Sequence, residues 1–301
     1  MTNTDTRSDI HAEITDRIIA AIESGAGDFT MPWHRDAART IPKNIASGNS
    51  YRGVNILALW IAQTTRDYQS NLWGTYRQWQ DQGAQVRRGE KATPVVFYKD
   101  VRREETSATG EIEMKRLLVA KASYAFNADQ VDGYTALPNP ALIDSTELLQ
   151  SVEQFVRSTQ ANIEHGGDRA LYRLDTDTIH LPPRERFFAT ATSSATDAYY
   201  STLLHELTHW TGAACRLNRD LANRFGSEAY AMEELVAELG AAFLCADLGI
   251  SVQPRPDHAA YVSNWLAVLK SDKRAVFTAA SQSSRAADFL RQFQVSEEAV
   301  V

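Results

Sequence analysis

The sequence predicts an α+β protein with two domains. Its 301 residues are enough for two hydrophobic cores, and patterns typical of helices and of strands occur in both halves. A segment with one glycine and two prolines, residues 132–140, interrupts these patterns before a new helical pattern starts. We therefore expect an N-terminal mixed α/β domain over residues 1–132, a linker over 133–144 and a C-terminal domain over 145–301.

In the N-terminal part, isoleucine recurs at every fourth position from Ile10 to Ile22, and Gly25 follows. This spacing places the isoleucines on one face of a helix that ends at the glycine. Two later stretches rich in β-branched and aromatic residues surround a short polar segment, which is typical of a hairpin. We expect helices over residues 8–24 and 54–66, and strands over 94–101 and 112–125 joined by a turn over 106–110.

In the C-terminal part, apolar residues recur at helical spacing in three stretches, and a single strand-like stretch ends at Pro182-Pro183. Because this stretch precedes the most distinctive motif of the chain, it could line a cleft there and pair with an extended peptide. We expect helices over residues 145–160, 198–210 and 227–244, and a strand over 170–181.

The distinctive motif is His205-Glu206-Leu207-Thr208-His209, an HExxH pattern inside a predicted helix. Two histidines four residues apart lie on one helix face, so both imidazoles can bind the same metal ion. The glutamate between them can accept a proton from metal-bound water, as in metalloproteases. Zinc is the default metal for such ligands, although manganese or cobalt could occupy them.

A catalytic metal site of this kind needs a third protein ligand. The best source is the helix over residues 227–244, where Glu234 and Glu238 lie four residues apart. We expect Glu234 to be the third ligand and Glu238 to accept the free N–H of a ligand histidine. This arrangement resembles the gluzincin metalloproteases. Glu233 and Glu238 remain alternatives for the ligand, and Tyr230 or His258 could stabilise the transition state.

Charge is divided unevenly along a chain whose net charge is −7. Residues 1–130 carry 17 basic against 16 acidic residues, which leaves 14 against 22 for the rest, and residues 33–103 alone carry 12 against 5. In that segment, cations alternate with aromatic residues, a combination that suits single-stranded nucleic acid. The alternative is structural: we expect Trp60 to belong to the core, and Trp73, Trp79 and Phe97 to be buried rather than exposed. We expect DNA contacts from Arg52, Arg87, Arg88 and Lys91.

Composition points to a cytoplasmic protein. The N-terminus is polar, no run of eighteen apolar residues exists, and the two cysteines form no metal-binding pair pattern. These features predict neither a signal peptide nor a membrane span.

Several blocks of the sequence resemble the ArdC-type plasmid antirestriction proteins. The blocks are 50–55 (SYRGVN), 73–78 (WGTYRQ), 83–91, 125–130 (AFNADQ), 205–212 and 225–243. This resemblance implies a single-stranded-DNA-binding domain followed by a zincin-like metallopeptidase domain, with His205, His209 and Glu234 as metal ligands and Glu206 as base.

The resemblance also implies that the protein protects incoming conjugative plasmid DNA from the host restriction system, with a restriction-system protein as substrate or target. Two alternatives remain: a non-catalytic DNA-binding decoy whose metal site is structural, and a plain cytosolic metallopeptidase whose basic half recruits substrate. An intact Glu206 favours a hydrolytic site, because a purely structural metal needs no base.

Overall fold

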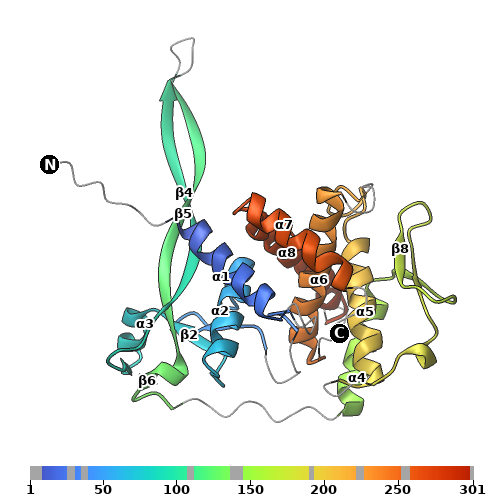
Figure 1. Cartoon of the computed structure of the whole chain (residues 1–301), viewed down its shortest axis with the longest axis horizontal. Coiled ribbons are helices and arrows are strands. Elements are labelled where there is room, and N and C mark those ends of the chain that lie inside the picture. Colours follow the sequence, from blue (N-terminus) through green and yellow to red (C-terminus); the bar gives the residue numbers. More distant parts are fainter. Residues whose placement is uncertain are drawn as a thin grey trace.

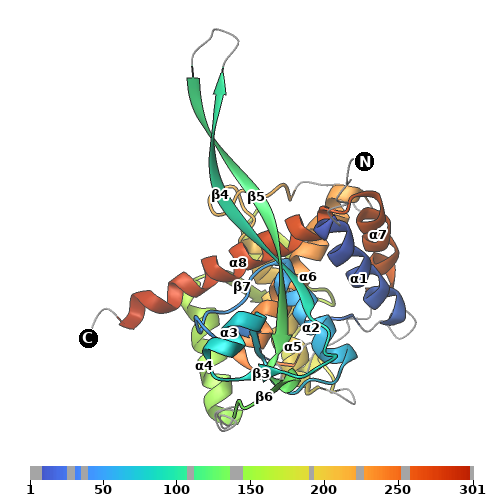
Figure 2. The ribbon, with the colours of Figure 1, turned by 90° about the vertical axis from the view of Figure 1, so that its left-hand side faces the viewer.

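A computed structural model gives the fold (Figures 1 and 2). It describes residues 9–25, 31–34, 40–106, 112–135, 145–189, 193–221, 227–251 and 258–298. The linker predicted over 133–144 lies mostly outside these residues, so its boundaries stay a prediction.

The N-terminal part combines helices with a four-stranded sheet of order β1-β2-β5-β4. The helices α1 and α2 confirm the two predicted helices, and the predicted isoleucine face of α1 is buried. The small pair β3-β6 and the helix α3 form a separate small core around Trp79. The elements are α1 (Ile10–Gly25), β1 (Lys43–Asn44), α2 (Val54–Thr65), β2 (Leu72–Gly74), α3 (Tyr76–Asp81), β3 (Gln85–Val86), β4 (Thr93–Thr106), β5 (Ile112–Asn127), the 3₁₀ helix η2 (Ala128–Gln130) and β6 (Val131–Asp132).

The strands β4 and β5 confirm the predicted hairpin and are longer than expected. They pair in antiparallel register from Thr93 with Ala125 to Thr106 with Ile112. In both views the far half of this hairpin projects away from the body of the molecule, while its near half belongs to the sheet (Figures 1 and 2). The predicted turn, apart from Thr106, lies outside the described residues.

The C-terminal part is mostly helical and contains a three-stranded sheet of order β7-β9-β8. The single strand predicted over 170–181 is wrong, because the chain turns at Leu174–Asp177, where Asp177 has a φ of 51°, and returns as β9. Since β9 is paired on both sides, it cannot also pair with a peptide. The elements are α4 (Ser145–Ser158), β7 (Asn162–His165), β8 (Leu171–Arg173), β9 (Thr178–Leu181), the 3₁₀ helix η3 (Arg184–Arg186), α5 (Ala195–Trp210), α6 (Glu228–Leu248), α7 (His258–Ser271) and α8 (Ala275–Glu298).

The largest hydrophobic core joins the two parts of the chain. It contains buried residues of α1, α2 and the N-terminal sheet together with residues of α6, α7 and α8. Trp60 of α2 packs against Phe243 of α6 with ring centroids 5.8 Å apart, and Trp33 packs against Trp265 of α7 at 6.0 Å. Helix α6 is therefore packed against the N-terminal part of the chain, and it also packs against α5, the helix that carries the HExxH motif.

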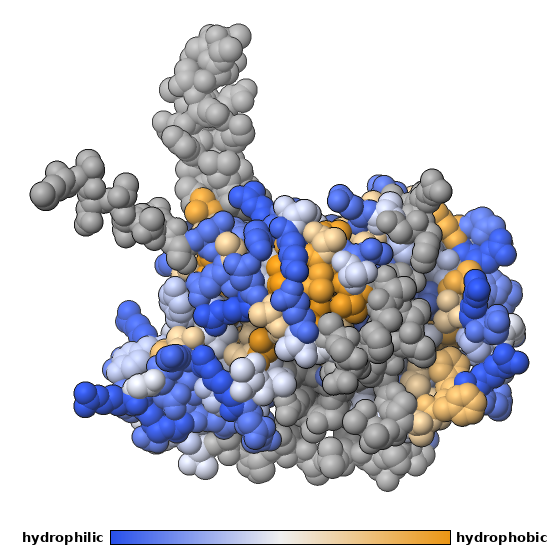
Figure 3. All heavy atoms as spheres, in the orientation of Figure 1, coloured by the Kyte–Doolittle hydropathy of each residue, from blue (hydrophilic) through white to orange (hydrophobic). Residues whose placement is uncertain are grey.

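The face of the molecule shown in Figure 3 is mainly hydrophilic where it is described. On the face shown in Figure 3, hydrophilic side chains cover most of the described surface, and hydrophobic ones gather in smaller patches. In the described part of the chain, no helix combines the length and the apolar composition needed to cross a membrane.

Candidate metal centre

Helix α5 presents the HExxH motif near its C-terminal end. Ser194 begins the helix with a capping box, in which its hydroxyl accepts the backbone N–H of Asp197 and the Asp197 carboxylate accepts in return. His205 and His209 then lie one turn apart, with ring centroids separated by 4.9 Å. His205 is buried and His209 is half-buried, so both imidazoles lie in a partly dehydrated site.

Helix α6 packs closely against α5 because both contact residues are small. A Cβ atom on Gly240 would lie 2.5 Å from the Thr208 Cγ2 atom and 2.7 Å from its Oγ1 atom, distances that no folded side chain tolerates. The Thr208 hydroxyl is itself fixed, since it donates to the Leu204 carbonyl at 2.8 Å. This close approach brings the glutamates of α6 next to the histidines of α5.

One of these glutamates, Glu234, lies between the two histidines. Its carboxylate oxygens are 3.6 Å from His205 Nε2 and 3.7 Å from His209 Nε2. One ligand atom from each residue falls within 4.8 Å of the others. Ligands bound at about 2.0–2.1 Å in a tetrahedral arrangement lie about 3.3 Å apart, so the three groups fit one cation after a small contraction.

The pKa of Glu234 is consistent with a ligand that is ionised at neutral pH. Burial alone would raise this pKa, but the interaction with His205 and the charges of both histidines lower it to about 2. The carboxylate therefore needs no deprotonation before it binds a cation.

The other ring nitrogen of each histidine faces a different carboxylate of the same helix. His209 Nδ1 donates to Glu233 Oε1 at 3.0 Å, and His205 Nδ1 lies 3.6 Å from Glu238 Oε2. Carboxylates in this position keep the ring tautomer in which Nε2 is free to bind metal. Glu238 lies beside His205 but beyond hydrogen-bond distance, so its role as an acceptor stays a prediction. Glu233 takes a position next to His209 that the sequence did not predict.

Glu233 is held in turn by Arg219. The guanidinium donates to both carboxylate oxygens, at 2.9 Å and 3.0 Å, and also to Thr211 Oγ1 at 2.9 Å. Burial would raise the pKa of Glu233, but the hydrogen bonds from His209 and Arg219 lower it below the ordinary value. Gly212 leaves room for this arginine, since a Cβ there would lie 2.9 Å from its Nη2 atom.

The N-terminal part of the chain contacts the other orienting carboxylate. Trp33 Nε1 donates to Glu238 Oε1 at 3.1 Å, and His34 Nε2 lies 3.0 Å from the same oxygen. Because the Met31 backbone N–H donates to His34 Nδ1 at 3.0 Å, the ring proton of His34 is on Nε2 and is donated to Glu238. The contacts with His205 therefore extend through Glu238 to a segment about 200 residues earlier in the chain.

The remaining predicted residues of the centre are placed as follows. Glu206 is buried on α5, next to His205. The hydroxyl of Tyr230, one turn before Glu234 on α6, forms a hydrogen bond with that carboxylate. His258 is the first residue of α7, and its side chain lies outside the described residues.

The four cations predicted to contact DNA lie in different surroundings. Arg52 is 61% exposed in its side chain and pairs with Asp288 of α8, which joins the two parts of the chain. The guanidinium of Arg87 forms contacts within the protein: it pairs with Glu90 and donates to the backbone carbonyl of Asp129. Arg88 and Lys91 are exposed near it.

The aromatic residues of the basic segment divide clearly between core and surface. Trp33, Trp60, Trp73 and Trp79 are at most 1% exposed, so they cannot stack on bases. Phe97 is 47% exposed, which makes its predicted burial wrong, and the neighbouring Tyr98 is 51% exposed. Both lie on β4, where adjacent residues point to opposite faces of the strand, so neither face is fully covered at this point.

Sequence reasoning missed Arg219, Trp33 and His34 as parts of the centre, and it named Glu233 only as an alternative ligand and not as a partner of His209. A weak signal existed for Glu233, because adjacent glutamates on a helix point about 100° apart and can contact two different histidines. Arg219 follows the motif by ten residues, a separation that says nothing about contact. For Trp33 and His34 the sequence holds no signal at all.

Comparison with known proteins covers both parts of the chain. The model for the N-terminal domain of the anti-restriction factor ArdC matches residues 8–126, and a model for zincin-like metallopeptidases matches residues 150–282. The protein y4eC of Sinorhizobium fredii (strain NBRC 101917 / NGR234) is 47% identical over 294 residues, which cover 96% of this chain and 94% of that protein. A DNA primase TraC of Escherichia coli is 36% identical over 94% of this chain, which spans 27% of the primase.

Solved structures agree with these matches. The metal-free crystal structure of the antirestriction protein ArdC from plasmid R388 is 38% identical, with a TM-score of 0.77 over 96% of this chain and 98% of that one. Its Mn(II)-bound structure gives a TM-score of 0.74 over 95% and 98%. The chain therefore belongs to the ArdC family of antirestriction proteins, and its zincin-like metallopeptidase domain follows the family's N-terminal domain in the sequence.

Proposed function

We propose that this protein protects incoming plasmid DNA from restriction, binds single-stranded DNA and hydrolyses a protein target at a divalent-metal centre. The observation that carries the hydrolytic part is the arrangement of His205, His209 and Glu234, with each histidine also facing an orienting carboxylate. A restriction-system protein is the proposed target, and the cytoplasm, where incoming DNA meets restriction enzymes, is the proposed compartment.

The residues fit a divalent cation. His205 and His209 would each bind through Nε2, and Glu234 would bind through its carboxylate. We favour Glu234 over Glu233 and Glu238 as third ligand, because those two carboxylates face the Nδ1 atoms instead. This donor set accepts zinc and also manganese, and the Mn(II)-bound ArdC of plasmid R388 supports a divalent cation here.

The chain's own residues then supply the remaining groups for peptide hydrolysis. The cation, when bound, provides the Lewis acid that polarises a carbonyl and acidifies a water molecule. Glu206 is the general base, which takes the proton from the attacking water and passes it to the leaving amine. Tyr230, whose hydroxyl contacts Glu234, is the candidate donor to the developing oxyanion.

Replacing Glu206 by Gln tests the proposal. The amide keeps the size of the side chain but cannot accept a proton, so metal binding should persist while hydrolysis falls by a factor of at least about 100. Cells that receive a plasmid by conjugation would express either the wild-type protein or Glu206→Gln, and plasmid survival and the recipient proteome would be compared. His205→Ala, which removes a ligand, serves as the control for loss of metal.

Two results are informative. Loss of antirestriction together with the persistence of a protein that wild type removes would support hydrolysis as the function. Full antirestriction by Glu206→Gln would contradict it and favour the non-catalytic alternative, in which the protein acts as a DNA-binding decoy.

A further inference from the structure

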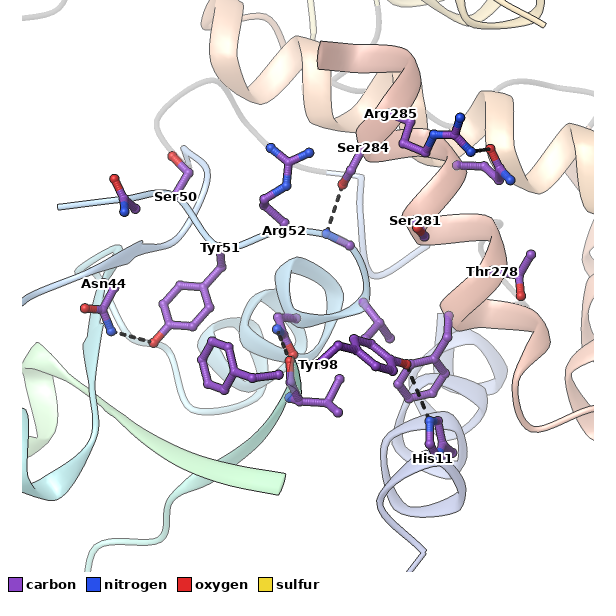
Figure 4. A pocket seen from close by; sticks show the side chains of 18 of the residues that line it. His11, Asn44, Ser50, Tyr51, Arg52, Tyr98, Thr278, Ser281, Ser284 and Arg285 are labelled. Atoms are coloured by element: carbon purple, nitrogen blue, oxygen red, sulfur yellow. Dashed lines mark hydrogen bonds between the residues drawn. The ribbon is translucent and has the colours of Figure 1, made fainter. Parts of the chain in front are cut away.

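A cavity of about 850 Å³ lies between the N-terminal part and helix α8, away from the metal ligands. Its walls come from the β1–α2 loop (residues 44–53), strand β4 and one face of α8. Figure 4 shows Tyr51 and Tyr98 on one side and Arg52, Ser284 and Arg285 on the other. No residue of the proposed metal centre lines this cavity, so it needs a different explanation.

The charge of the lining is unusual for this chain. Three arginines, Arg52, Arg274 and Arg285, line the cavity, and none of the described lining residues is acidic. The whole chain carries a net charge of −7, so this excess of basic over acidic residues in the described lining is not a consequence of overall composition. Arginine side chains bind phosphate through two parallel hydrogen bonds, so this lining favours a polyanion.

Two aromatic groups line the same cavity. Tyr51 and Phe97 lie with ring centroids 6.5 Å apart, and Phe97 is about half exposed. Tyr98, also about half exposed, reaches His11, whose ring packs on Phe277 of α8 with centroids 4.7 Å apart. Exposed rings beside arginines are the combination that binds unpaired bases, because every base can stack on a ring.

The cavity depends on contact between the two parts of the chain. The Gly53 backbone N–H donates to Ser284 Oγ of α8 at 2.9 Å, and Arg52 pairs with Asp288 of the same helix. Gly53 has a φ of 57° and a ψ of −138°, a conformation that essentially only glycine adopts. This glycine turns the loop so that the residues before it and the face of α8 lie opposite each other.

We propose that this cavity holds a short segment of single-stranded DNA, with phosphates on Arg274 and Arg285 and bases against Tyr98 and Phe97. The inference rests on the proposed DNA binding and adds that a helix of the metallopeptidase half forms one wall of the site. Arg87, Arg88 and Lys91 do not line it, whereas Arg52 does.

The test measures binding of a fluorescein-labelled oligodeoxythymidylate at several salt concentrations. The double variant Arg274→Gln/Arg285→Gln should bind at least about tenfold more weakly at 0.1 M salt. Its slope of log affinity against log salt should also become shallower by about 1.4, since each lost phosphate contact on a single strand accounts for about 0.7. The matched control is Arg157→Gln/Arg169→Gln, which removes two exposed arginines outside the cavity and should behave as wild type.

A second pair of variants tests stacking. Tyr98→Ala should weaken binding about tenfold without changing the salt slope, while Tyr98→Phe, which keeps the ring, should bind as wild type. Normal binding and a normal salt slope for both the arginine variant and Tyr98→Ala would overturn the assignment of the cavity. If wild-type protein itself does not bind the oligonucleotide, the proposed DNA binding fails, and the cavity proposal fails with it.

Discussion

At the scale of single residues, the candidate metal centre includes side chains that are not among the proposed metal ligands. Glu233 accepts hydrogen bonds from His209 and from Arg219, and the side chains of Glu233 and Arg219 are only 11% and 6% exposed. A buried ion pair held by several hydrogen bonds fixes the position of its members better than an exposed one. Glu233 is therefore a positioning residue for His209.

Glu233→Gln should lower metal affinity by a factor of about 10 to 100, because His209 loses the ionised acceptor that fixes its tautomer. The affinity for Mn(II) or Zn(II) can be measured by titration against a chelator of known strength. Glu228→Gln is the matched control, since it removes the same charge from an exposed position of the same helix. Equal affinities in the two variants would show that Glu233 has no positioning role.

The difference between Glu206 and Glu233 shows which residues a sequence can assign. The HExxH pattern is local, because residues one turn apart on a helix share a face whatever the rest of the fold does. The role of Glu233 depends instead on how α6 is rotated against α5, and 23 residues separate Glu233 from the end of α5 at Trp210. Rotation of one helix against another is set by packing, so the choice among Glu233, Glu234 and Glu238 stayed open at the sequence level.

At the scale of elements, the packing of α5 on α6 determines the distances in the centre. Gly240 is in the middle of α6, where glycine costs about 1 kcal/mol of helix stability relative to alanine. A glycine is needed at this position because the side-chain atoms of Thr208 occupy the space that a Cβ atom would need. At this contact the two helices approach closely because glycine has no side chain.

Gly240→Ala should destabilise the protein by about 1–3 kcal/mol, despite the better helix propensity of alanine, because Thr208 and α5 must move. The shift should also weaken metal binding, since His205 and Glu234 are on the separated helices. Urea unfolding of Gly240→Ala, Thr208→Ala and the double variant measures the coupling. The double variant should recover part of the loss. A stabilised Gly240→Ala variant would contradict the close-packing argument.

Elements with a clear period were predictable, and those that depend on a turn were not. The isoleucine repeat predicted α1 to within two residues at each end, because the buried face of a helix has a fixed spacing. The stretch over 170–181 was predicted as one strand, although Asp175 and Asp177 lie in its centre. The turn there is stabilised by Arg216, which pairs with Asp177 from beyond α5. Such a distant partner leaves no trace in the local sequence.

At the scale of the molecule, one carboxylate connects the N-terminal part of the chain to the candidate metal centre. Glu238 accepts hydrogen bonds from Trp33 and His34 on one oxygen and faces His205 with the other. The hydrogen bonds from Trp33 and His34 fix the orientation of the Glu238 carboxylate. Anything that moves the segment around Trp33 therefore changes the support of a metal ligand.

Trp33→Phe should weaken metal binding about three- to tenfold, less than loss of a direct partner of a ligand histidine, because one of the two donors to Glu238 remains. Trp60→Phe is the matched control, because Trp60 is equally buried in the same core. Its indole N–H donates to the Thr40 carbonyl, whereas that of Trp33 donates to Glu238. Both changes remove one indole N–H and a similar volume, so their effects on metal-free stability should be alike. Metal titration should then show a lower metal affinity for Trp33→Phe than for Trp60→Phe. Equal affinities in the two variants would show that the contact from Trp33 to Glu238 has no influence on the centre.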